Sequence, residues 1–134
     1  MSRLIFGVSA VGLILGWDGV VAHHGDAGRY NETVITLAGT VVAFRMMNPH
    51  SITLVDVTDE SGAVVTWQVE GLSANALVNR GWTTETIKPG DRITMTGRPL
   101  LSGAPFMNVN EKARIILTDT GEEITRSRDY VETE

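Results

Sequence analysis

The chain has 134 residues, which is enough for one domain with a modest hydrophobic core. Its formal net charge of -5 would repel a polyanion, so we do not expect nucleic acid as a partner. The absence of cysteine excludes disulfide bonds and thiolate metal sites.

The first residues have the features of an export signal. A positive charge precedes an apolar run over residues 4–17, and Val20-Val21-Ala22 matches the small-x-small pattern that signal peptidase cleaves. The apolar run is shorter than the ~20 residues that span a bilayer. We therefore predict that the leader is cleaved, that no membrane anchor remains, and that the mature chain begins at His23 in the periplasm or outside the cell.

The next part of the chain has the composition of β-strands. Three strands are predicted, at residues 33–45, 51–57 and 63–70. Gly39 lies in the middle of the first one and predicts a bulge or bend that lets a long strand serve two sheets. The segment Asn48-Pro49-His50 ends that strand, because proline cannot donate to a β-ladder.

A short helix is predicted after the third strand. Ser73 is a possible N-cap, apolar residues follow at helical spacing, and Gly81 is a C-terminal stop. Beyond the helix, residues 92–99 predict a fourth strand and residues 111–119 a fifth, with a loop at residues 101–105 between them.

This order of elements predicts the fold. Three strands, one short helix and two more strands are the order of the five-stranded OB-fold. We therefore predict an all-β fold, a small OB-like Greek-key barrel, with a plain β-sandwich as the alternative. The charged C-terminal residues are expected to form a short ordered edge followed by a flexible end. The predicted organisation is a signal peptide at residues 1–22, an N-terminal segment at 23–32, the barrel at 33–120 and a charged tail at 121–134.

Several short motifs occur together in an order that one protein family shares. They are "AHHG" after the leader, "GTVVAFRMMNPH", "LSANALVNRGW" and "IKPGD". Over roughly Ala22 to Ile116 the chain resembles a family of small exported bacterial proteins known only as a domain of unknown function. The resemblance implies an OB-like barrel and a periplasmic location, and it supplies no established activity.

Two positions depart from the pattern of that family. Met46-Met47 precede the NPH motif where the family usually has the aromatic-containing "WTNPH", and Gly25 stands where the family has a serine after the double histidine. A ligand that required this aromatic side chain would lose it in this chain.

The three histidines, His23, His24 and His50, are the candidate metal ligands. If cleavage follows Ala22, the α-amine and imidazole of His23 can chelate one ion, and His24 or His50 can add a third nitrogen. Such nitrogen sets suit Cu(II). His50 is in range, because about nine residues reach some 30 Å when extended. If Ala22 remains, His24 instead binds copper together with the amine and two amide nitrogens.

The same residues have structural interpretations. A double histidine near a terminus is more often a mobile polar segment, and the ring of His50 can simply cap a backbone group in its turn. Met46, Met47 and Met107 offer thioethers for Cu(I), but the first two would point to opposite faces of a strand. The remaining binding candidates are Asn48, Glu70, Asn75 and Arg80, which could contact an anion or a partner or could be solvated.

The sequence lacks the motifs of common enzymes. It has no Ser-His-Asp order, no HExxH motif, no P-loop and no glycine-rich dinucleotide fingerprint. We therefore expect a binding module, either a periplasmic copper-binding module or a metal-free module that docks a partner protein or copies of itself. A copper-dependent oxidase would need a substrate surface that the sequence does not show.

Overall fold

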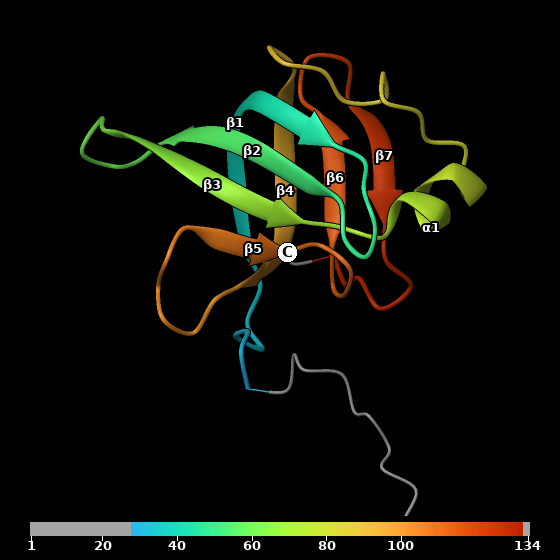
Figure 1. Cartoon of the computed structure of the whole chain (residues 1–134). Coiled ribbons are helices and arrows are strands. Elements are labelled where there is room, and N and C mark those ends of the chain that lie inside the picture. Colours follow the sequence, from blue (N-terminus) through green and yellow to red (C-terminus); the bar gives the residue numbers. More distant parts are fainter. Residues whose placement is uncertain (1–27, 133–134) are drawn as a thin grey trace, which may run out of the picture.

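The computed structural model describes residues 28–132, whose strands close into a barrel with one short helix at its end (Figure 1). The elements are β1 Ile35–Arg45, β2 Ile52–Thr58, β3 Val64–Glu70, α1 Ala74–Asn79, β4 Arg92–Pro99, β5 Phe106–Asn108, β6 Arg114–Leu117 and β7 Glu122–Arg126. Within this part of the chain, no helix is long and apolar enough to cross a membrane.

The barrel is formed by five strands in the order β1-β2-β3-β5-β4, and pairing between β1 and β4 closes it. The β3–β5 pair is parallel, and the other barrel pairs are antiparallel. The helix lies between β3 and β4 in the chain. This arrangement confirms the predicted OB-like barrel.

β1 was predicted to serve two sheets, and in the structure it pairs with two neighbours within one closed sheet. Its first half pairs with β4 and its second half with β2, and the two sets meet at Thr40. The irregularity in register, expected at Gly39, lies between Val41 and Ala43 instead. Gly39 has another reason to lack a side chain, since a Cβ there would lie 2.5 Å from the backbone oxygen of Asp56.

The fifth predicted strand differs from the observed one. Two strands, β5 and β6, pair along the same edge of β4, and residues 109–113 separate them. β6 lies inside the predicted strand at 111–119, but β5 makes the parallel contact with β3 that completes the barrel. With three residues, β5 is too short to give a periodic pattern in the sequence.

The ordered structure extends beyond residues 33–120 on both sides. β7 lies in the segment expected to be a charged tail, pairs with β6, and packs Ile124 against the core. Tyr30 pairs with Leu100 and is buried. β7 agrees with the short ordered edge expected at the start of this segment. The packing of Ile124 and the burial of Tyr30 were not expected, because a single apolar residue among charges, or a single aromatic before the first strand, gives too weak a pattern.

The core combines the inner face of the barrel with residues around α1. Alternation along the strands points one set of side chains inward. The helix adds Leu77, and the segment that follows it adds Trp82 and Ile87. The fully buried strand residues include Val41, Val55, Val69, Ile93, Met95 and Met107.

Candidate metal and binding site around His50

The turn between β1 and β2 carries the NPH motif and is fixed to the segment between β3 and α1. The peptide bond before Pro49 is cis. On one side of the turn Ala74 N donates to Met47 O at 3.0 Å, and on the other side Ser51 N donates to Leu72 O at 3.0 Å. These bonds fix the backbone that carries His50, although the turn itself is exposed.

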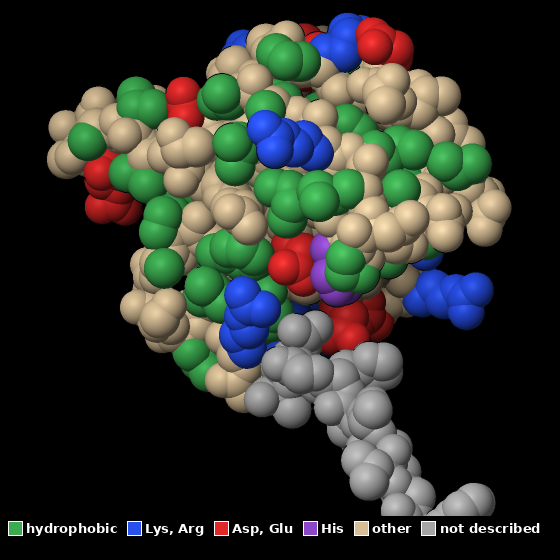
Figure 2. Space-filling model, viewed as in Figure 1, with side chains coloured by type: hydrophobic (Ala, Val, Ile, Leu, Met, Phe, Trp, Pro, Cys, Tyr) green, Lys and Arg blue, Asp and Glu red, His purple; other side chains and the backbone are tan. Residues whose placement is uncertain are grey.

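His50 lies beside Glu70. Its Nδ1 is 3.8 Å from Oε1 of Glu70, and the exposed fractions of the two side chains are 48% and 12%. Ile52 pairs directly with Glu70 across the β2–β3 ladder, which explains why the two groups meet. The distance is too long for a hydrogen bond, so the contact is electrostatic and strengthens when the imidazole is protonated. Figure 2 shows a histidine next to an acidic side chain on this face.

Asn48 and Asn75 connect the turn to the helix. Asn48 Nδ2 donates to Asn75 Oδ1 at 3.5 Å, and Asn75 N donates to Asn48 Oδ1 at 3.4 Å. Both bonds are long, so they hold the turn weakly. The helix itself matches the prediction, because the Ser73 side chain accepts a bond from Ala76 N and Gly81 has a φ of 83°.

The methionines occupy different environments. Met107 is fully buried in the core, and Met46 packs against the core. Met47 is 45% exposed and borders a hollow on the outer face of β1 and β2. Of the three thioethers considered as Cu(I) ligands, that of Met47 is the one near the surface and near His50 in the chain.

Arg80 is separate from the other candidates. It follows the last residue of α1, and its N–H donates to the carbonyl of Leu77 at 2.9 Å, while Gly81 N donates to the carbonyl of Val78. Its side chain is exposed and forms no hydrogen bond or ion pair with any residue in the described part of the chain. The structure therefore pairs Asn48 with Asn75 and His50 with Glu70, and it leaves Arg80 outside these contacts.

His23 and His24 lie outside the described residues. Within residues 28–132, no group of three or more histidine, aspartate and glutamate side chains could hold a metal ion. A metal at His50 would therefore need ligands from elsewhere in the chain.

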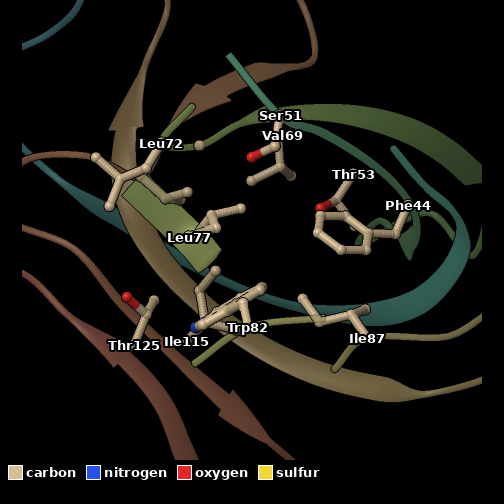
Figure 3. A pocket seen from close by; sticks show the side chains of 12 residues that line it. Phe44, Ser51, Thr53, Val69, Leu72, Leu77, Trp82, Ile87, Ile115 and Thr125 are labelled. Carbon is tan, nitrogen blue, oxygen red and sulfur yellow. The ribbon is translucent and has the colours of Figure 1, made fainter. Parts of the chain in front are cut away.

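A small cavity lies at the end of the barrel near α1, where residues of the barrel strands meet Ile115 of β6 and Thr125 of β7 (Figure 3). Apolar side chains line most of it, among them Phe44, Leu77 and Trp82, and Ser51 and Thr125 add hydroxyl groups. Its volume is about 30 Å³. This is room for one or two water molecules, whereas small-molecule pockets measure roughly 300 to 1,000 Å³. The cavity is thus part of the core packing and not a ligand site.

Sequence reasoning missed the way the N-terminal segment is attached to the barrel. Arg98 donates to the backbone oxygen of Asn31 at 3.0 Å and to Glu32 at 2.6 Å. Beside it, Asn31 N donates to Pro99 O, and Tyr30 pairs with Leu100. We call residues Arg29–Glu32 the N-terminal anchor. These contacts join positions far apart in the chain, so no local sequence pattern predicts them.

Charge strengthens the N-terminal anchor. Lys112 Nζ lies 2.9 Å from Glu32, and Arg98 adds a second positive charge. The hydrogen bond from Lys112, and then the charge of Arg98, hold the pKa of Glu32 below its ordinary value of 4.5. Glu111 also contacts Arg98, at 2.8 Å. The segment that precedes β1 is thus fixed only a few residues after His23.

Comparisons with known proteins place the chain in a family. No curated protein matches it. Residues 13–106 match the model of a family of unknown function, DUF6152, and this stretch contains the NPH turn, β3 and α1. The match covers more than half of the sequence and agrees with the resemblance of the motifs, so the chain belongs to this family of unknown function.

Proposed function

We propose that this protein is a copper-binding module of the bacterial periplasm, in which the α-amine and imidazole of His23 hold Cu(II). A further nitrogen comes from His24 or His50. Nitrogen ligands and a tetragonal geometry are what Cu(II) prefers, and this ion stands at the top of the affinity order for such sites. The α-amine titrates near pH 8 and is a ligand in its neutral form, so affinity falls as the pH falls below that value.

The observation that carries the proposal is the setting of His50. Its imidazole is half exposed, faces the carboxylate of Glu70, and makes no hydrogen bond to another described side chain. Carboxylates commonly orient metal-binding imidazoles from one ring nitrogen while the other nitrogen binds the ion. His50 is thus available as a ligand. Nδ1 would have to come closer to Glu70 than the present 3.8 Å before this carboxylate orients the ring.

The reach of the N-terminal segment also supports the proposal. Gly28, where the described chain begins, is the fifth residue after His23, and a segment of this length extends about 17 Å at most. The N-terminal anchor fixes the point from which this reach is measured. A copper ion on His23 therefore stays near the barrel.

The test is copper binding by protein purified from the periplasm. Intact mass establishes whether the chain begins at His23, and electron paramagnetic resonance with a chelator competition measures nitrogen ligation and affinity. We expect His23→Ala to weaken Cu(II) binding at least tenfold. The third nitrogen is identified with His24→Ala and His50→Ala. The variant that changes the nitrogen coupling in the electron paramagnetic resonance spectrum lacks that ligand.

A matched control isolates the amine. A protein with three extra residues before His23, none of them histidine, keeps every imidazole but places no histidine within the first three positions. It should lose as much affinity as His23→Ala. If the exported chain starts at His23 and His23→Ala binds copper as the unchanged protein does, the proposal is wrong. A chain that starts at Ala22 should instead depend on His24.

A metal-free interaction module is the second candidate. The observation in its favour is a hollow of about 260 Å³ on the outer face of β1, β2 and β3, lined by Met47, Ile52 and Leu54 together with the polar side chains of Arg45 and Gln68. Val42, which lies on β1 but does not line the hollow, is also exposed. Apolar groups exposed together are typical of protein-binding surfaces. A protein that lacks copper affinity at physiological pH would favour this candidate.

A further inference from the structure

β3 has an unpaired edge along its first half. β2 pairs with the whole strand, whereas β5 pairs only with the part from Gln68 to Glu70. The segment from Val64 to Trp67 has no neighbouring strand on that side among the described residues. Figure 1 shows the β2–β3 hairpin projecting beyond the barrel, which leaves this edge accessible.

The backbone groups at this edge can be assigned. Gln68 N donates to Pro105 O and so points away from β2. Alternate residues of an antiparallel ladder turn their N–H and C=O groups to the same side. Val64 and Thr66 therefore direct theirs to the free edge.

The side chains at this edge do nothing to block another strand. The sequence from Val64 to Trp67 is VVTW, which has high β-propensity, no charge and no proline. The outer edge of the sheet at β7 is different, because it carries Glu122, Glu123 and Arg126. Natural proteins protect free edges with such charges, and an edge without them is suited to pairing.

We infer that the free edge of β3 binds a second copy of this chain, with the two β3 strands antiparallel about a two-fold axis beside Val65. In this register Val64 of one copy and Thr66 of the other exchange their backbone hydrogen bonds. The pairing ends before Gln68, where β5 occupies the edge. The shared edge is short, so the dimer is weak and depends on concentration. This inference does not depend on the copper proposal.

Charge complementarity favours this partner and this register. The tip of the β2–β3 hairpin of one copy meets the start of β5 in the other. The tip carries the exposed carboxylates of Asp59 and Glu60. The start of β5 carries a cation, since the Arg29 guanidinium lies 5.3 Å from the centre of the Phe106 ring and forms no ion pair with a described residue. The two-fold axis makes each attraction occur twice.

Sedimentation velocity of the exported protein from micromolar to millimolar concentration tests the inference. We expect monomer to convert to dimer, and we expect Val64→Lys to raise the dissociation constant at least tenfold. Val78→Lys is the matched control, because Val64 and Val78 are 63% and 56% exposed and the latter lies on α1. A monomer at every concentration, or an equal effect of the two variants, would overturn the inference.

A charge exchange tests the register. Arg29→Glu and Glu60→Arg should each weaken the dimer several-fold, and the double variant should restore it. A dimer that the double variant does not restore is paired in another way, which contradicts the inference. Adding copper or a chelator should leave the monomer–dimer equilibrium unchanged. The dimer can therefore fail while copper binding holds, and copper binding can fail while the dimer holds.

Discussion

Arg98 shows how one side chain can hold the segment before β1, which is not one of the five strands or the helix of the OB-fold, against the barrel. Its side chain is 11% exposed and contacts both Glu32 and Glu111. A guanidinium presents several donors in a rigid plane, so it can serve several acceptors at once. Burying the charge of Arg98 without these acceptors would cost free energy. The N-terminal anchor is therefore needed to stabilise an arginine at this position in β4.

The pKa of Glu32 gives a prediction about pH. Because Lys112 and Arg98 hold its folded-state pKa below 4.5, the stabilising contribution is fully present above pH 4.5. It is lost as the pH falls through the lower folded-state pKa. Glu32→Gln should therefore reduce the urea midpoint at pH 7, and the difference from the unchanged protein should shrink in acid. Glu85→Gln, at an exposed position without an ion pair in the described structure, is the control. A difference that grows in acid would contradict the assignment.

Single residues also show how much of the site could be read from the sequence. Gly39 was identified as a special position, but its cause is the approach of the β2 backbone, which only the folded barrel reveals. His50 was identified by its residue type. Glu70 is also a candidate by residue type, but nothing in its sequence position joins it to His50, because the β2–β3 register brings the two together.

At the scale of elements, α1 was the most predictable part. The signals that start and stop a helix are local, and Ser73 and Gly81 act as expected. β5 was the least predictable, because its position depends on pairing with β3 and β4 and not on its own short sequence. Local signals predict an element well where neighbouring residues supply its backbone hydrogen bonds, as in a helix. They predict it poorly where a distant strand supplies those bonds.

The cap of α1 can be tested directly. The Ser73 hydroxyl accepts the bond from Ala76 N at 3.2 Å, and a helix this short depends on such bonds. Ser73→Ala should lower the free energy of unfolding by about 1 kcal/mol, as measured by urea denaturation. Ser73→Asp preserves an acceptor and should remain near the original stability. Equal losses in both variants would show that the hydroxyl has another role.

At the scale of the whole molecule, the two ends of the described chain are attached in different ways. The N-terminal anchor adds Tyr30 to the buried residues, and its ring centre lies 6.2 Å from that of Phe106. The C-terminal end packs Tyr130 between the guanidinium groups of Arg114 and Arg126, at 5.7 and 5.0 Å from its ring. Tyr30 stabilises its end of the chain through burial from water, whereas Tyr130 does so through cation–π contacts at a partly exposed site.

This difference predicts unequal effects of two tyrosine substitutions. Tyr30→Ala removes a buried ring and should lower the free energy of unfolding by about 3 kcal/mol. Tyr130→Ala removes two partly exposed cation–π contacts and should cost about 1 kcal/mol. Urea denaturation of both variants measures the difference. Equal effects would mean that the N-terminal anchor is not part of the cooperative core. The point from which the reach of His23 is measured would then lie at β1, a few residues later.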